Sequence, residues 1–546
     1  MYFGVGPYGP KFVRAALYLL FVACIEQVSY NVIRGILEVE LKDLGLYEYD
    51  YIDFILRHIT SFFVIMLLPL LVARIATDDG VGKHKVVTLR IKIAEIICFY
   101  GSLLASAAIL ILQLLGKFDY IPRELFSPIR HDMYCHEKTP YMCVWIHYAI
   151  RVLALPYNSM VSSCALPALL GLRRPKLIVY VMLVKNVLWI LGVLISLYIL
   201  EISLLGVALS DLCSNFAAYV VWKRMLRKHT TFREMYRFHD SQDDRIKSPD
   251  FKTRKTKNDK RGQRESRGSG AQRRCLRPTE ACRFCCYLCR GNDRLYNQVR
   301  KQFWGDVFVM GVRSTVFLAV DAAVTLIFDA ENIKKEWSVN AAFDAIHRIS
   351  AIPYNFGSAV SCVVIVTASK YLNEIYRVYN PYDFENLALR FPKFVFIAAI
   401  ICSVVAVILA PYAVGETLTS ASGLVDLVGI IPFVIAQTLA TTAQVYEGLL
   451  FASLDLQYLM TVALVCAFPY VACVGAAFYE FHYTSLLWTA LGIFSLQRLY
   501  LVYRRVHYHI LPKMEQEANN IDEFDALLRD SDEEEDAIFL RTINMK

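Results

Sequence analysis

Twelve stretches of this sequence are long and apolar enough to cross a lipid bilayer, and this feature constrains the fold more than any other. A transmembrane helix needs about 20 mostly apolar residues to span the hydrocarbon core. Such stretches lie near residues 11–38, 52–75, 91–115, 142–166, 176–200, 203–223, 303–328, 343–369, 391–415, 424–450, 457–480 and 484–503. The composition agrees, because 56% of the 546 residues are hydrophobic, against roughly 45–50% in soluble proteins. We therefore predict an all-α, multi-pass membrane protein with twelve transmembrane helices.

Basic residues in the short loops predict how the chain is oriented. The turns after the second and fourth stretches hold most of them, namely Arg74, Lys83, Lys85, Arg90, Lys92, Arg173, Arg174 and Lys176. Because short cytosolic loops carry an excess of Lys and Arg, we expect both turns to face the cytosol. The number of stretches is even, so both termini are expected there too. The opening "MYFGVGPYGPKFVR" runs straight into the first stretch and shows no cleavable signal peptide.

A long polar segment between the sixth and seventh stretches divides the chain into two six-helix lobes. The expected units are an N-lobe over 1–223, a cytosolic linker over 224–302, a C-lobe over 303–505 and an acidic cytosolic tail over 506–546. From Lys223 to Arg300 there are 23 Lys/Arg against 9 Asp/Glu. Such a composition is typical of a disordered segment that is attracted to anionic lipid. No recognition fold accompanies the charge, so nucleic acid is not an expected partner.

The linker contains the motif "CRFCCYLC", with thiols at Cys282, Cys285, Cys286 and Cys289. Zinc modules separate their CxxC pairs by a dozen or more residues, whereas these pairs abut. The spacing instead places all four thiols on one face of a helix between basic residues, which favours palmitoylation at the membrane surface. Unmodified cytosolic thiols are the next alternative, and no metal site is expected.

The two halves look like distant copies joined by a cytosolic linker, an arrangement found in transporters whose lobes are related by a pseudo-two-fold axis along the membrane normal. The fourth to sixth stretches read "RVLALPYNSMVSSCALPALLGLRRPK" and onward, with an Arg and a Pro in the fourth stretch. Further positions of note are Gly171 and Pro175 in the following turn, Asn186 in the fifth stretch, and Gly206 and Ala208 at the start of the sixth. The second half contains "VRSTVFLA" and "YEGLLFASLDLQYLM".

In order and spacing these motifs resemble those of multidrug and toxic compound extrusion (MATE) transporters, over 11–223 and 303–505. The two motifs of the second half are similar to the DinF-like branch, and the chain is identified as a divergent eukaryotic member. The resemblance implies an antiporter that exports organic, often cationic or amphipathic, solutes in exchange for H⁺ or Na⁺ by alternating access. We expect a monomer that binds a small organic solute, the coupling ion and membrane lipid, and that needs no cofactor.

Charged residues inside helices are functional candidates by default, because burying a charge in hydrocarbon is costly. The DinF-like pattern has an acid about five residues before the glycine of the first helix, but here Tyr30 holds that place before Gly35. Glu26, one turn earlier, is a plausible substitute as proton carrier, and equally a structural partner of Arg34.

A second set of charged candidates lies in the C-lobe. The stretch "GVRSTVFLAVDAAVTLIF" holds Arg313 and, two helical turns later, Asp321. A buried arginine stays charged and needs a carboxylate or water nearby, and Glu447 is the first choice for that partner, with Asp321 the second. Either protonation of Glu447 gates the lobe, or a permanent pair locks it.

Other polar residues of the helices are candidates for the solute cavity. They are Gln27, Asn31, Arg34, Tyr157, Asn158, Asn186, Tyr354 and Asn355. Tyr157–Asn158 and Tyr354–Asn355 each follow a proline, whose kink frees backbone carbonyls that a cavity can use. Packing alone also explains these two motifs.

The tail holds 11 Asp/Glu between Glu515 and Asp536 and includes "EFDALL", with Glu523, Leu527 and Leu528. This sequence resembles an acidic dileucine sorting signal, which indicates the plasma membrane or a vacuole- or lysosome-like compartment; a plain solvated tail explains it as well. Two other functions remain open, a lipid-linked oligosaccharide flippase of the same superfamily and a transport-dead scaffold or sensor. No nucleotide loop, metalloprotease signature or nucleophile elbow is present in the sequence, so we do not expect an enzyme.

Overall fold

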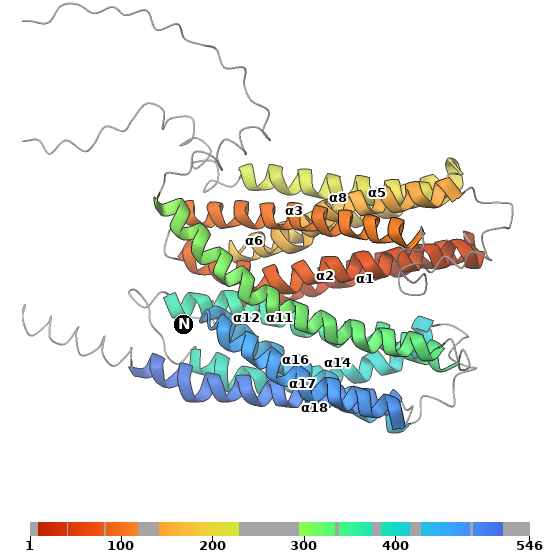
Figure 1. Ribbon diagram of the computed structural model, residues 1–546. Helices are drawn as coiled ribbons and strands as arrows, with labels where there is room; N and C mark the ends of the chain where they lie inside the picture. Colours follow the sequence, from red (N-terminus) through yellow and green to blue (C-terminus); the bar gives the residue numbers. More distant parts are fainter. Residues whose placement is uncertain are drawn as a thin grey trace, which may run out of the picture.

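The computed structural model is built from long helices. It describes residues 9–40, 42–80, 83–117, 141–201, 203–228, 294–332, 338–373, 384–414, 427–480 and 484–516. In these residues twelve helical segments run back and forth in two blocks of six (Figure 1). Nine of the helices in this part of the chain are long and apolar enough to cross a membrane. The predicted all-α, twelve-helix architecture is therefore confirmed.

The N-lobe contains the first six segments. They are α1 (Pro10–Glu40), α2 (Lys42–Gly80), α3 (His84–Lys117), α5 (Tyr141–Met160) with η1 (Val161–Ala165) and α6 (Leu166–Gly171), α7 (Pro175–Leu194) with η2 (Ile195–Ile199), and α8 (Ser203–Lys228). The turns η1 and η2 are π-helical, so the fourth and fifth segments continue through them with one wider turn.

The C-lobe repeats the arrangement. Its segments are α11 (Arg294–Asn332), α12 (Ser338–Asn373), η3 (Asn386–Arg390) with α14 (Phe391–Val414), α16 (Leu427–Ala452), α17 (Leu456–Glu480), and α18 (Thr484–Arg505) with η4 (Val506–Ile510). Helix α8 ends at Lys228 and α11 begins at Arg294, so helical structure extends a few residues beyond the lobe boundaries 223 and 303. Of the twelve segments, α11, α16 and α18 are not among the nine apolar spans.

The internal repeat is visible in two turns. After α6, Arg173 has φ 59°, and the Arg174 N–H donates to the Leu169 carbonyl at 2.8 Å. After α16, Leu454 has φ 61°, and the Asp455 N–H donates to the Leu450 carbonyl at 3.1 Å. Both turns therefore end a helix with the same left-handed residue and the same six-residue hydrogen bond, although neither uses glycine at that position. The fourth and tenth segments are structural counterparts.

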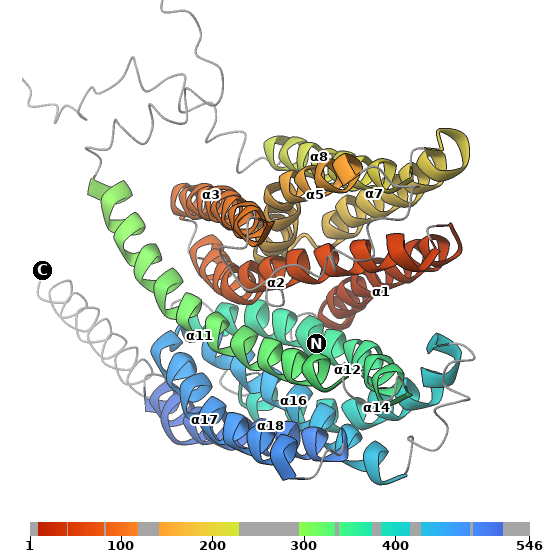
Figure 2. The same cartoon turned by 45° about the vertical axis from the view of Figure 1, so that its right-hand side comes forward.

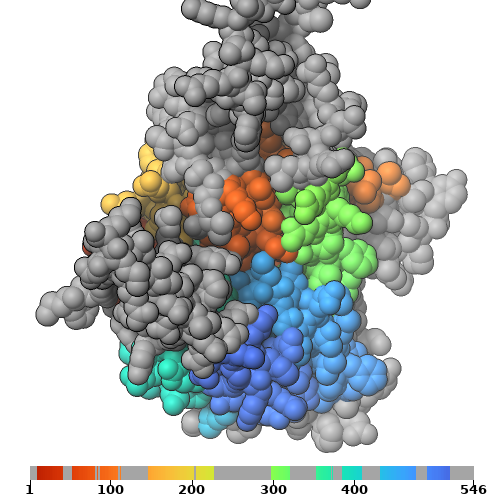
Figure 3. Space-filling model, turned by 90° about the vertical axis from the view of Figure 1, so that its left-hand side faces the viewer, coloured from red at the N-terminus to blue at the C-terminus, as the bar shows by residue number. Residues whose placement is uncertain are grey.

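In the part of the chain that the structure describes, the two lobes share an apolar core at one end. We call the end where α8 stops and α11 starts the linker end. One continuous core there contains buried residues of both lobes, such as Leu70 on α2, Phe303 on α11 and Leu449 on α16. Figures 1 and 2 show α11 crossing from the N-lobe to the C-lobe, and Figure 3 looks at this end, where orange N-lobe atoms lie beside green α11 and the blue helices.

The remaining buried clusters each belong to a single lobe. In the N-lobe, Ile33 packs with Val193 and Val207, and Ile52 packs with Tyr148. In the C-lobe, Phe433 packs with Ala406 and Trp488, whose ring centroid lies 4.9 Å away. In the part of the chain that the structure describes, the apolar core shared by the lobes is thus the one that includes the linker end.

Candidate functional site

The first charged site is buried inside the C-lobe, and we call Arg313, Glu447 and Arg498 the C-lobe cluster. Arg313 on α11 donates from Nη2 to Glu447 Oε2 at 2.8 Å. Arg498 on α18 donates from Nη2 to the same oxygen at 2.6 Å and from Nε to Glu447 Oε1. The three side chains are 6%, 4% and 9% exposed, so the helices exclude solvent from all of them.

Two aromatic rings cover the C-lobe cluster. The guanidinium carbons of Arg313 and Arg498 lie 4.6 Å and 5.0 Å from the ring centre of Phe317, and Arg313 lies 5.3 Å from that of Phe451. Because a ring face attracts a cation, these contacts stabilise the two guanidinium groups where water does not reach. The cluster itself contains two positive charges and one negative charge, so Glu447 holds α11 and α18 to α16 through charge-assisted hydrogen bonds.

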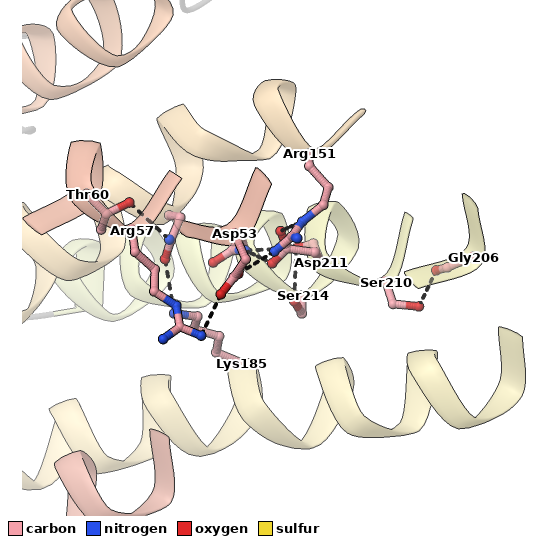
Figure 4. A network of polar contacts seen from close by, with 11 residues as sticks. Asp53, Arg57, Thr60, Arg151, Lys185, Gly206, Ser210, Asp211 and Ser214 are labelled. Atoms are coloured by element: carbon pink, nitrogen blue, oxygen red, sulfur yellow. Dashed lines mark hydrogen bonds and ion pairs between the residues drawn. The ribbon is translucent and has the colours of Figure 1, made fainter. Parts of the chain in front are cut away.

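The second charged site lies in the N-lobe, and Figure 4 shows Lys185 and Thr60 from it. Lys185 on α7 donates from Nζ to Glu26 Oε1 on α1 at 3.1 Å and to Asn158 Oδ1 on α5 at 3.0 Å. Asn158 in turn donates to Thr60 Oγ1 on α2 at 3.4 Å. Lys185 is 8% exposed, whereas 47% of the Glu26 side chain is exposed. The lysine thus connects a partly buried amide to a half-exposed carboxylate.

A row of alternating charges lies next to Lys185, and we call Arg57, Asp53, Arg151 and Asp211 the N-lobe row. Arg57 and Arg151 each pair with Asp53, at 2.5 Å and 2.6 Å. Arg151 Nε also faces Asp211 Oδ2 on α8, at 3.7 Å (Figure 4). The charges of the row sum to zero, which lowers the cost of placing them between helices.

A third group of charges joins the two lobes at the linker end. Arg74 on α2 contacts Asp306 on α11 through Nη2 at 2.6 Å and through Nε at 2.9 Å. These side chains are 12% and 15% exposed. On α3, Arg90 pairs with Asp78 at 2.7 Å and reaches Gln302 Oε1 on α11 at 3.5 Å. Arg74 and Arg90 are expected from the sequence in a cytosolic turn, but both lie on helices and are largely buried.

Comparison with solved structures identifies the fold. No family model matches the sequence, and no curated protein matches it either. Among solved structures, a mutant of the Vibrio cholerae MATE transporter VcmN covers 92% of this chain and 97% of its own, with a TM-score of 0.65 and 11% identity. The fold is that of MATE transporters.

Two further structures agree with this assignment of the fold. A multidrug resistance MATE family transporter of the MOP superfamily, in an outward-facing conformation, has a TM-score of 0.62 and 12% identity and covers 93% of this chain and 96% of its own. A MOP superfamily transporter from Pyrococcus furiosus Vc1, whose binding pocket is described as having reverse polarity, has a TM-score of 0.63 and 11% identity and covers 92% and 96%. The MATE fold thus includes nearly the whole chain.

Within the MATE fold, some of the predicted site residues come together. The expected pairing of Arg313 with Glu447 is confirmed. Lys185 donates hydrogen bonds to both Glu26 and Asn158 and so brings these two predicted residues together. For Asp321 the structure describes the backbone in α11 but not the side chain. Cys282, Cys285, Cys286, Cys289, Glu523, Leu527 and Leu528 lie outside the described residues.

Other predicted cavity residues contact groups of their own helix or of their own lobe. Gln27 donates to Asn31 Oδ1 at 3.3 Å on the same face of α1, where Arg34 is half-buried. Tyr157 packs edge-on against Phe216 with ring centroids 5.3 Å apart. Asn186 is buried and donates to the Met182 carbonyl of its own helix at 2.8 Å. All of these contacts lie within the N-lobe.

The two Pro-Tyr-Asn motifs occupy different places in the MATE fold. Tyr157 and Asn158 lie on α5, the fourth segment, whereas Tyr354 and Asn355 lie on α12, the eighth. The eighth segment is the counterpart of the second, so the motifs are not related by the repeat. Tyr354 is 50% exposed, and Asn355 is partly buried.

Asp53, Arg57 and Arg498 are among the charged residues of these sites that sequence reasoning did not identify as candidates. Asp53 and Arg57 stand four residues apart at the start of the second stretch, and Arg498 stands near the end of the last. Charged residues at helix ends usually reach the membrane interface, so position alone suggested no buried role. Their i,i+4 spacing was the one available signal for the first two.

Proposed function

We propose that this protein is a secondary active antiporter that moves a small organic solute, cationic or amphipathic, in exchange for H⁺ or Na⁺ by alternating access. The observation that carries the proposal is the way in which the described residues of the two lobes pack, with the shared core at the linker end. They share a core and the Arg74–Asp306 pair at the linker end, while Ile33 and Phe433 belong to clusters confined to one lobe. Two lobes that meet at one end can rock about a site between them.

The proposed coupling residues are Glu26, Arg313, Asp321 and Glu447. The two glutamates differ in their surroundings, and this difference supports different roles for them. Glu447 is held by two arginines and is 4% exposed, which supports the locking role of the C-lobe pair over gating by protonation. Glu26 is 47% exposed, so solvent or an ion can reach it.

The proposed solute cavity lies between the lobes and uses polar side chains of α1, α5, α7 and α12. Asn158 and Tyr354 support this proposal best, because Asn158 belongs to the Lys185 hydrogen-bond group and Tyr354 is half exposed. Gln27, Asn31, Arg34, Tyr157, Asn186 and Asn355 complete the proposed lining. The solute, the membrane and the monomeric state are likewise proposals.

Uptake into proteoliposomes tests the function. The purified full chain is reconstituted, a pH or Na⁺ gradient is imposed, and the accumulation of a panel of fluorescent organic cations, with ethidium among them, is followed. The proposal expects gradient-dependent accumulation of at least one cation, which stops when the gradient is dissipated by an ionophore. Accumulation that is equal with and without the gradient would count against antiport.

One observation favours a second function, flipping of a lipid-linked oligosaccharide. Arg57 joins Arg34 as a basic residue of the transmembrane helices that is at least partly exposed, and basic groups suit the phosphates of such a lipid. Movement of a fluorescent lipid-linked oligosaccharide across liposomes, in the absence of cation transport, would favour this alternative. Inactivity in both assays would favour a scaffold or sensor.

We also propose a topology with the linker, tail and termini in the cytosol, at the plasma membrane or a vacuole- or lysosome-like membrane. The loop charges support the orientation. The linker thiols Cys282, Cys285, Cys286 and Cys289 are proposed palmitoylation sites, and Glu523, Leu527 and Leu528 a proposed sorting signal. The Arg74–Asp306 pair then lies on the cytosolic side.

A further inference from the structure

We infer that Asp211 on α8 is the carboxylate that binds the coupling proton in the N-lobe, and that Arg151 is the group that responds to it. The inference rests on the proposed antiport and adds a residue that the sequence analysis did not place at the coupling site. It follows from how the carboxylates of the two charged sites are compensated by cations.

Among the carboxylates of the N-lobe row, Asp211 is the one held least tightly. Asp53 has guanidinium groups at 2.5 Å and 2.6 Å. The guanidinium nearest to Asp211 is that of Arg151, whose Nε lies 3.7 Å away, beyond hydrogen-bond distance. The direct hydrogen bond to the Asp211 carboxylate comes instead from a neutral group, Asn215 Nδ2, at 2.8 Å. The Asp211 side chain is 18% exposed, whereas that of Glu447 is 4% exposed.

Three helices contribute charged groups to the electrostatic surroundings of Asp211. The charged groups are Arg151 on α5, Lys185 on α7 and Asp53 on α2. A titratable side chain nearby is His147, which is buried beside Arg151 on α5. Lys185 is bonded to Glu26 and Asn158, so Arg151 is the cation of the row that faces Asp211 directly.

Neutralising each carboxylate in turn distinguishes them. Without the charge on Glu447, two buried arginines lose their carboxylate. Without that on Asp53, Arg57 and Arg151 lose the carboxylate that lies 2.5 Å and 2.6 Å away, and Arg151 keeps Asp211 at 3.7 Å. Without the charge on Glu26, Lys185 retains a neutral amide at 3.0 Å. Without the charge on Asp211, Arg57 and Arg151 still bind Asp53, and Lys185 still binds Glu26. In the described residues of the two sites, Asp211 is therefore the acid whose protonation leaves each of these cations with a carboxylate.

Protonation of Asp211 has a simple mechanical consequence. The charged form draws Arg151, and with it α5, towards α8, whereas the neutral form leaves Arg151 to Asp53 on α2. The proton therefore exchanges an α5–α8 attraction for a tighter α2–α5 pair. Helix α2 also carries Arg74 of the inter-lobe pair. A change in the packing of α2 can therefore shift the equilibrium between the closed and the open linker end. A ligand shifts such an equilibrium by its differential affinity for the two states.

Transport by Asp211→Asn tests the inference. Two readouts are taken from proteoliposomes that contain the full chain: ethidium counterflow without a gradient, and ethidium accumulation driven by a pH gradient. We expect Asp211→Asn to retain counterflow and to lose pH-driven accumulation by about tenfold or more. Asp211→Glu should retain both, and Asp455→Asn, which removes an acid from a turn of the C-lobe, serves as the matched control. Wild-type pH-driven accumulation by Asp211→Asn, or loss of counterflow by folded protein, would overturn the inference.

If the wild-type protein does not transport ethidium, the transport assay bears on the proposed function and not on Asp211. A second measurement then tests the role of Asp211 without transport. Infrared difference spectra of wild-type protein between about pH 8 and pH 5 report protonation of carboxylates directly. We expect a protonated-carboxyl band that is absent in Asp211→Asn and present in Asp455→Asn. Persistence of the full band in Asp211→Asn shows that Asp211 does not take the proton.

Discussion

Glu447 accepts hydrogen bonds from two buried arginines, and this predicts a structural role that mutation can reveal. Glu447→Gln removes the only carboxylate of the C-lobe cluster and leaves Arg313 and Arg498 uncompensated between helices. Breaking a buried pair by removing one partner costs about 3–5 kcal/mol. We expect the free energy of unfolding in detergent to fall by that amount, measured by thermal or chemical denaturation.

The matched control for Glu447→Gln is Asp455→Asn. Asp455 pairs with Arg505 at 2.7 Å, but these side chains are 23% and 33% exposed. A solvent-exposed pair contributes about 1 kcal/mol or less, so this variant should unfold almost as wild type does. Equal stability of Glu447→Gln and Asp455→Asn would contradict the locking role and return gating by Glu447 to consideration.

At the residue scale, the sequence predicted one partner of the C-lobe cluster and missed the other. Arg313 lies within an apolar stretch, so its need for a carboxylate was evident, and Glu447 was the acid of a recognisable turn motif. Arg498 is 51 residues from Glu447 in the chain, and Arg151 is 98 residues from Asp53. Which distant charges meet depends on how the helices rotate and pack, and a single sequence does not contain that rotation.

At the scale of elements, the packing of α2 against α11 predicts that Arg74 and Asp306 hold the linker end closed. Arg74→Asp places two carboxylates together and should open this end, because like charges repel strongly where solvent is scarce. The additional change Asp306→Arg should close it again. Hydrogen–deuterium exchange of α11 residues 297–310 measures the opening, with faster exchange expected in the single variant and wild-type exchange in the double variant.

A charge reversal within one lobe serves as the control for that experiment. Arg505→Asp breaks the pair with Asp455, which joins elements of the C-lobe alone. It should leave exchange of α11 residues 297–310 unchanged. If Arg74→Asp has no more effect than Arg505→Asp, the Arg74–Asp306 pair does not hold the lobes together.

The linker motif also makes a prediction at this scale. Replacing Cys282, Cys285, Cys286 and Cys289 by Ser should abolish acyl-exchange labelling of the protein, because these thiols are the proposed acylation sites. The variant should elute as folded protein in size-exclusion chromatography. Persistent labelling, or zinc bound at a stoichiometric level, would rule out the lipidation proposal.

The number and order of the helices could be predicted because each must bury about 20 apolar residues in lipid. Details inside the helices could not. The π-helical turns at Val161–Ala165 and Ile195–Ile199 have no distinctive composition, and the left-handed residues of the repeated turns are Arg173 and Leu454 rather than glycine. Tertiary packing sets these features, since the local sequence does not favour them.

For the whole molecule, the loop charges predict which face of the membrane each segment occupies. Reporters inserted in the linker and in the segment between α3 and α5 should lie on opposite sides of the membrane. The first is rich in Lys and Arg, whereas the second is balanced in charge. Glycosylation or protease accessibility of the two reporters in cells decides the matter, and a cytosolic location for both would invalidate the proposed topology.

Alternation of the two lobes is the central claim, and distances at both ends of the molecule test it most directly. Dyes introduced through non-natural amino acids at Arg174 and Tyr508 report on the linker end, and dyes at Ile199 and Ile408 report on the opposite end; these side chains are exposed. Single-molecule energy transfer in nanodiscs, recorded across a range of pH, should show two states in which one distance rises as the other falls. A single state, or distances that rise and fall together, would contradict alternating access.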